Sequence, residues 1–138
     1  MKEILCISSY PPRECRIATF TDDLVRAVHQ KFGTSYAFRV CALESENEKH
    51  VYDPIVKYTL DTSSEIAYTS VANLVEQDAD IELVLVQHEF GLFHGQEDVF
   101  LQFLKRISQP KVIVFHTVLS CPAAICSSAV AIAFSGEL

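Results

Sequence analysis

The chain has 138 residues, 49% of them hydrophobic and 21% charged, so we expect one soluble globular domain rather than a disordered segment. The formal net charge of −7 argues against a nucleic-acid partner, because such binding relies on clustered Lys and Arg. The five cysteines include no C-x-x-C pair, so neither a disulfide framework nor a zinc site is predicted.

The first predicted element is a buried strand at Ile4–Ile7, closed by the turn pair Pro11-Pro12. No signal-peptide pattern precedes it, and no apolar run of the chain reaches membrane-spanning length. We therefore expect a cytoplasmic protein without a transmembrane segment, with peripheral membrane contact left open. A helix follows, ending near Gly33. Its apolar residues at helical spacing are Ile17, Phe20, Leu24 and Val28.

The middle of the chain predicts two strands and a second helix. Residues 36–43 have strand composition, and residues 56–60 alternate between apolar and polar, as in a half-exposed strand near a sheet edge. Thr62 and Glu65 have the spacing of a capping box, which predicts a helix that begins after Thr62. The apolar face of that helix is formed by Ala67, Val71, Leu74 and Val75.

The last third contains a strand at Ile81–Val86, a helix that stops before Pro110, and a short strand at Val112–Phe115. Because strand and helix alternate, the predicted fold class is α/β with a mainly parallel sheet. Residues 120–136 carry no charge, and Ala129–Phe134 is a candidate sixth strand. We divide the chain into a domain at residues 1–119 and a divergent apolar tail at 120–138, as expected of an incomplete domain.

Three strand exits carry the candidate chemistry, because ligands of open parallel sheets bind at the carboxyl ends of the strands. The first exit, residues 8–19, has no glycine, so binding of NAD or FAD through a dinucleotide fingerprint is not expected. The loop leads into a helix amino terminus, which favours an anion, and Arg13 and Arg16 could add positive charge. The alternative is a surface loop with two solvated arginines.

The second exit contains His88, Glu89 and His94, and Gly91 and Gly95 give its backbone freedom. This arrangement is not H-E-x-x-H, so no metal site is predicted. The third exit places His116 directly after a buried strand. A simpler interpretation of the second exit is a strand end with polar caps and a flexible turn, and a simpler interpretation of His116 is a structural histidine. If the two strands are neighbours, we expect both histidines to face one crevice, where imidazole suits proton transfer or hydrogen bonding to sugar hydroxyls.

The three exits together resemble the family 4 (group 1) glycosyltransferases of the GT-B fold. The stretch "SSYPPRECRIATFTDDLV" is similar to a first loop and helix that usually contain C-G-I-A-T-F-T. The stretch "LVLVQHEFGLFHGQED" is similar to Q-H-E-F-G-I-F-G-G, and "VIVFHTVL" is similar to T-F-H-T-V-L. The likeness runs from about Ile4 to Leu119 in the same order and at similar separations.

The resemblance implies a Rossmann-like three-layer sandwich that forms the amino-terminal, acceptor-side half of a retaining glycosyltransferase. Such enzymes transfer a sugar from a nucleotide-sugar to an acceptor, generally without a metal ion, so no cofactor is expected beyond that co-substrate. By the resemblance, Arg16, Ile17 and Ala18 approach the donor phosphates. The resemblance also implies that the acceptor side is lined by His88, Glu89 and Gly91. It further implies that His116 contacts the transferred sugar, which makes it the candidate catalytic residue.

Two departures from the family pattern affect this prediction. Arg16 stands where the family has a small glycine, so close approach of the loop to a phosphate could be blocked. After Leu119 the likeness fades, so we expect the donor-binding domain to be missing and the chain to transfer no sugar alone. The alternatives are a non-catalytic carbohydrate-binding or interaction module of the same fold, and a small flavodoxin-like nucleotide or redox module.

Overall fold

The structure is a computed structural model that describes residues 1–89, 91–93, 95–116 and 131–135. In chain order its elements are β1 (Glu3–Ser8), α1 (Arg16–Phe32), β2 (Ala37–Glu44), β3 (Val56–Asp61), α2 (Glu65–Gln77), β4 (Ile81–His88), α3 (Glu97–Arg106), β5 (Lys111–Phe115) and β6 (Ala131–Ser135). The strands form one six-stranded sheet in the order β3-β2-β1-β4-β5-β6. Strands β1 to β5 are parallel, and β6 is antiparallel to β5. The predicted α/β class with a mainly parallel sheet is confirmed.

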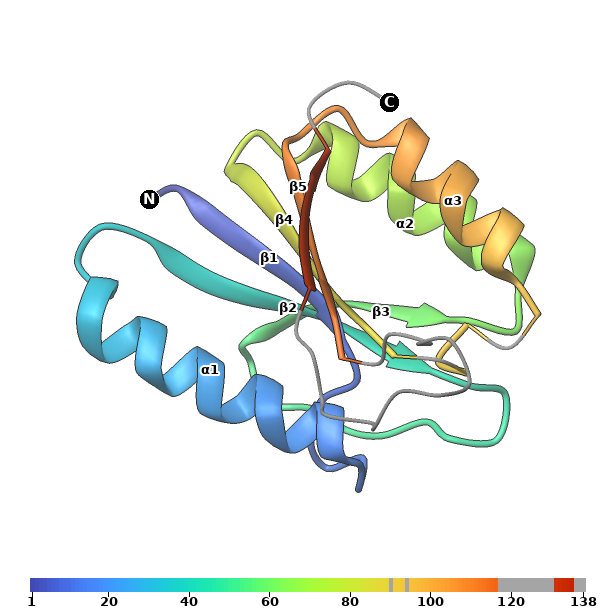
Figure 1. The fold of residues 1–138 in the computed structure, drawn as a ribbon, viewed down its shortest axis with the longest axis horizontal. Helices are drawn as coiled ribbons and strands as arrows, with labels where there is room; N and C mark the ends of the chain where they lie inside the picture. Colours follow the sequence, from blue (N-terminus) through green and yellow to red (C-terminus); the bar gives the residue numbers. More distant parts are fainter. Residues whose placement is uncertain (90, 94, 117–130, 136–138) are drawn as a thin grey trace, which may run out of the picture.

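The helices cover both faces of the sheet and complete a Rossmann-like three-layer sandwich. Helix α1 lies on one face, and α2 and α3 lie side by side on the other (Figure 1). From β1 the chain continues outward through β2 and β3, whereas β4 starts on the other side of β1 and leads to β5. The strand order therefore reverses between β1 and β4. The carboxyl ends of these two strands mark the position where open parallel sheets bind ligands.

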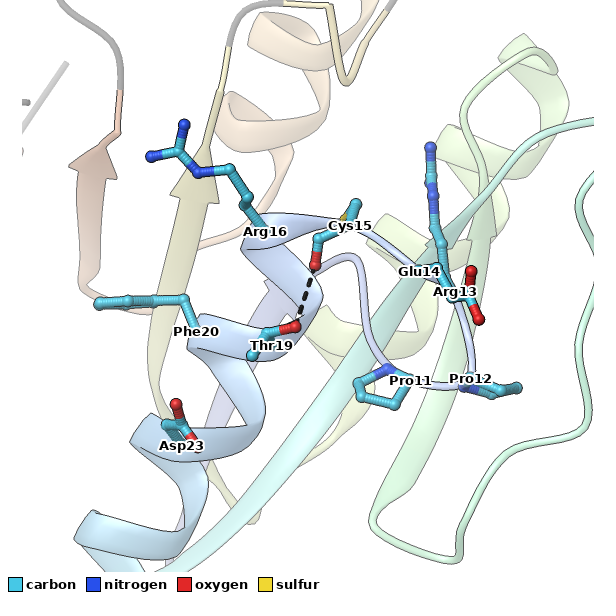
Figure 2. A pocket seen from close by; sticks show the side chains of 9 residues that line it. All are labelled: Pro11, Pro12, Arg13, Glu14, Cys15, Arg16, Thr19, Phe20 and Asp23. Carbon is cyan, nitrogen blue, oxygen red and sulfur yellow. Dashed lines mark hydrogen bonds between the residues drawn. The ribbon is translucent and has the colours of Figure 1, made fainter.

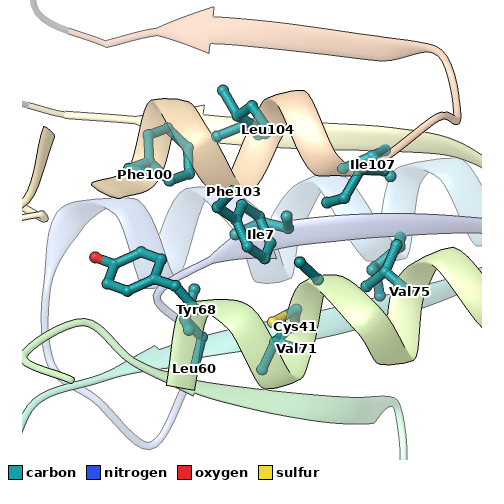
Figure 3. Packing of buried hydrophobic residues seen from close by; sticks show 14 of the residues in the cluster. Ile7, Cys41, Leu60, Tyr68, Val71, Val75, Phe100, Phe103, Leu104 and Ile107 are labelled. Carbon is teal, nitrogen blue, oxygen red and sulfur yellow. The ribbon is translucent and has the colours of Figure 1, made fainter. Parts of the chain in front are cut away.

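The larger hydrophobic core lies between the sheet and the pair α2 and α3 (Figure 3). Tyr68 of α2 and Phe103 of α3 are almost completely buried there, and their rings meet edge to face with centroids 6.0 Å apart. The apolar stripe of α3 supplies Phe100, Phe103 and Leu104 to this core. A smaller cluster lies between the sheet and α1.

Two local predictions are wrong. The cap of α2 is Ser64, whose hydroxyl accepts a hydrogen bond from the Ala67 N–H, whereas Thr62 donates its hydroxyl to the Glu44 carbonyl at the end of β2. The predicted capping box therefore lies two residues too early. Phe20, predicted in the buried stripe of α1, is 42% exposed. Thr21 is buried instead, and its hydroxyl makes a hydrogen bond with Ser8.

The amino-terminal edge of the sheet is held by ion pairs. The buried Glu3 carboxylate of β1 accepts hydrogen bonds from Arg39 Nε at 3.2 Å and Lys57 Nζ at 2.6 Å, which joins three strands. Lys57 also pairs with Asp78. These charges lie at the opposite end of the strands from the predicted site, so they serve the fold.

The strand predicted at Ala129–Phe134 is present as β6, one edge strand of the sheet. Its residues 131–135 pair with β5, so part of the predicted tail continues the sheet. Residues 120–130 lie outside the described residues. Within the described ranges, no helix is long and apolar enough to cross a lipid bilayer.

We predict that Phe103→Ala lowers the free energy of unfolding by about 3–5 kcal/mol, because it removes a ring from the centre of the larger core. Urea denaturation at neutral pH measures this change. Leu101→Ala is the matched control, since Leu101 lies on the same helix and is 42% exposed. We expect the control to stay within about 0.5 kcal/mol of the parent chain. Equal losses in the two variants would contradict the described packing of α3.

Candidate functional site

The three predicted exits lie at the carboxyl edge of the sheet, around the point where the strand order reverses. The loop after β1 leads into α1, and β4 and β5 are paired neighbours. His88 lies opposite Phe115 in the β4–β5 register, and the His116 N–H donates to the His88 carbonyl at 2.9 Å. The prediction that the two strands carrying these histidines are neighbours is therefore confirmed.

The expectation that both histidines face one crevice is wrong. The His88 ring stacks on Phe93 at 5.7 Å between centroids, on the side of α3. The His116 ring meets Phe20 of α1 edge to face at 4.7 Å, on the other side of the sheet. The reason is strand geometry: side chains alternate between faces, so the residue after Phe115 points away from the face that Phe115 shares with His88.

His116 is surrounded by groups that restrain its ring and its charge. Its Nε2 lies 2.6 Å from Oε1 of Gln87, a residue of β4 with no exposed surface. Burial lowers the pKa of His116, Glu89 acts to raise it and Arg16 acts to lower it further. The ring is therefore a neutral imidazole near pH 7, with a carboxylate and a guanidinium close enough to influence it.

The three residues predicted on the acceptor side come together around a small cavity. His88, Glu89 and Gly91 line it with Phe93 and Glu97, and its volume is about 50 Å³. This volume has room for a hydroxyl group or a water molecule, which occupies about 30 Å³ in the liquid, but not for a sugar ring. Gly91 has φ +90°, a backbone conformation that other residues rarely adopt, so the glycine permits this turn.

The His88 side chain contributes a polar atom to an apolar setting. Its Nδ1 is buried and has no hydrogen-bond partner among the described residues. Burial lowers the pKa of His88, and the Glu97 carboxylate opposes this shift. Neutral His88 is thus compatible with its stacking on Phe93, while its protonated form is not well accommodated.

The three residues predicted near the donor phosphates, at the amino terminus of α1, differ in what they offer. The side chains of Ile17 and Ala18 are buried in the core, whereas Arg16 is exposed. Cys15 caps the helix, because its sulfur accepts the Ala18 N–H at 3.4 Å. The Ala18 amide is therefore already engaged. Of the three, Arg16 is the residue whose side chain is presented to a ligand.

An open pocket of about 720 Å³ runs along this helix terminus (Figure 2). Arg16 and Phe20 project from the same side of α1, toward the strand ends, and Pro11 and Pro12 form the wall contributed by the loop. Arg13 also lines the pocket, but it donates to the Leu43 carbonyl and pairs with Glu48 at 3.0 Å. Arg13 therefore has a structural role that the interpretation as a solvated arginine did not include.

Sequence reasoning missed two residues of this site, Gln87 and Phe20. Gln87 falls just after the predicted strand Ile81–Val86, which extends to His88 in the structure. A glutamine next to a buried apolar run was the available signal, because a buried amide needs partners. Phe20 follows the spacing of the helix stripe, so the sequence offered no sign that it would contact His116 instead of the core.

Within the described part of the chain, no three His, Cys, Asp or Glu side chains are grouped as metal ligands, and His94 lies outside the described residues. Comparison of the chain with models of protein families, with curated proteins and with solved structures finds no match. The resemblance to glycosyltransferases therefore stays a prediction from the three motifs.

We predict that the buried His88 makes stability depend on pH. Its pKa is lowered in the folded chain, so its contribution is present above the unfolded value near 6.5 and is lost as pH falls toward the folded value. His88→Phe keeps a stacking ring and removes the titration. Urea denaturation at pH 7.5 and pH 5.0 should show a smaller loss of stability in the variant than in the parent chain. The same loss in both would contradict the prediction.

Proposed function

We propose that the chain is the acceptor-side domain of a retaining glycosyltransferase and that His116 contacts the transferred sugar. The observation that carries the proposal is the position of His116 at the carboxyl edge of the sheet, near the reversal of strand order. There its imidazole is held by Gln87 and influenced by both Arg16 and Glu89. A neutral hydrogen-bonding ring with a cation and a carboxylate in its surroundings suits a ligand that carries both hydroxyl groups and phosphates.

Each group has a role in this proposal. The bond between the sugar and the nucleotide phosphate breaks, a bond to an acceptor oxygen forms, and the proton of the acceptor hydroxyl passes to the departing phosphate. The imidazole of His116 hydrogen-bonds to the sugar more strongly as charge develops at the reacting carbon, which lowers the barrier. Arg16 neutralises donor phosphate beside the amino terminus of α1. Glu89 and the small cavity at His88 receive a hydroxyl group of the acceptor.

Transfer on this proposal needs a second, donor-binding domain that holds most of the nucleotide-sugar. We expect the 138 residues to bind sugar through His116 at the carboxyl edge of the sheet, but not to turn over a nucleotide-sugar by themselves. No metal ion or resident cofactor has a part in this scheme.

A second candidate is a non-catalytic carbohydrate-binding or interaction module of the same fold. It is favoured by the terminus of α1, where Arg16 replaces the small glycine of the family pattern and Cys15 already accepts the Ala18 N–H. A module that has lost donor binding has no requirement for an open phosphate loop. Under this alternative, glycans bind without a contribution from His116.

We predict that methyl glycosides of glucose, mannose and N-acetylglucosamine perturb the His116 ring signals in NMR titrations of the chain. His116→Ala should weaken binding of a responding glycoside about tenfold, as expected for one lost hydrogen bond. Lys31→Ala is the control, because Lys31 is exposed in the last turn of α1, far from Arg16 at the start of that helix.

The outcomes separate the candidate functions. Binding that His116→Ala leaves unchanged would contradict the sugar-contact role and favour the non-catalytic module. Hydrolysis or transfer of UDP-glucose or GDP-mannose by the purified chain would contradict the requirement for a donor-binding domain.

A further inference from the structure

Gln87 is a completely buried polar residue near the site. Its exposed fraction is 0%, and it lies at the end of β4 on the face of the sheet that α1 covers. Burying a side-chain amide is unfavourable unless its polar atoms are hydrogen-bonded. An apolar residue would fill this strand position at lower cost, so the contacts of the amide indicate what it does.

The carbonyl end of the amide meets His116. Gln87 Oε1 lies 2.6 Å from His116 Nε2, and a carbonyl oxygen can only accept a hydrogen bond. The proton of the neutral ring must therefore be on Nε2, and Nδ1 carries the lone pair. Because burial lowers the pKa of His116, the neutral ring is the form that this contact has to orient.

The nitrogen end of the amide faces the core. Gln87 Nε2 is buried and makes no hydrogen bond with a described residue. Burial strongly raises the pKa of the neighbouring Cys6 thiol, and the Gln87 side chain beside it acts in the opposite direction. Cys6 is fully buried in the cluster under α1. Because Gln87 is completely buried, its side chain has little room to move, and its oxygen stays directed at His116.

We infer that Gln87 is a positioning residue for His116. Its buried oxygen holds the ring proton of His116 on Nε2, so that Nδ1 is the atom that accepts a hydrogen bond from a hydroxyl group of the sugar. Two further contacts hold the residue. The backbone N–H of His116 donates to the His88 carbonyl at 2.9 Å, and the ring meets Phe20 edge to face. The inference rests on the proposed function only for the identity of the ligand.

The test uses two variants of the whole chain, one expected to change the tautomer of His116 and the other its pKa. Gln87→Met keeps the length of the side chain and removes the acceptor, so the His116 ring should become a mixture of two tautomers. Gln87→Glu puts a carboxylate at the same position, so the pKa of His116 should rise by about one unit or more. Nitrogen-15 NMR of labelled histidine measures both quantities. His88 is the internal control, because its ring lies on the other face of the sheet.

We expect the His88 signals to stay as in the parent chain in both variants, which also reports that the fold is kept. A His116 ring with unchanged tautomer and unchanged pKa in both variants would overturn the inference. Where His116→Ala weakens the binding of a glycoside, Gln87→Met should weaken the binding of the same glycoside by about the same factor. Lost tautomer control with unchanged glycoside binding would overturn the positioning role. Glycoside binding insensitive to His116→Ala would instead overturn the proposed function.

Discussion

The register between β4 and β5 is the constraint on which the rest of the site depends. Pairing of His88 with Phe115 sets the two strand ends level, and the alternation of side chains then sends successive residues to opposite faces. A shift of β5 by one residue along β4 would turn the imidazole of His116 to the aromatic side of the core, where it would lose its amide partner Gln87. The chemistry of the carboxyl edge is therefore decided by backbone pairing.

The same alternation gives the two histidines different environments although burial lowers the pKa of both. His88 stacks in an aromatic cluster beside a cavity of about 50 Å³, and its buried Nδ1 has no hydrogen-bond partner among the described residues. His88 therefore contributes to the shape of the cavity more than to the charge around it. His116 has an amide on Nε2 and an aromatic edge against the ring. The second environment fixes the orientation of a neutral imidazole, as the proposed contact with a sugar requires.

Much of the fold could be predicted from the sequence, because apolar periodicity is a local signal. The strands and helices occur where the pattern of Ile, Val, Leu and Phe indicated, and the predicted exits meet at one edge. The sequence could not tell which face each exit residue occupies, because that depends on where β4 ends. The strand was predicted to stop at Val86 and continues to His88. Phe20 was misplaced for a related reason, since periodicity defines a stripe on a helix but not the angle at which the helix meets the sheet.

The amino terminus of α1 shows how a side chain can change the use of a helix end. A helix amino terminus attracts anions through its unpaired N–H groups. Here the Cys15 sulfur accepts a hydrogen bond from one of these N–H groups, that of Ala18. The side chains of Ile17 and Ala18 anchor the terminus in the core. The positive charge of Arg16 then stands outside this capped terminus and near His116. On the proposed function, a donor phosphate would be recognised mainly by a mobile charged side chain, which tolerates different donors better than a rigid ring of backbone amides does.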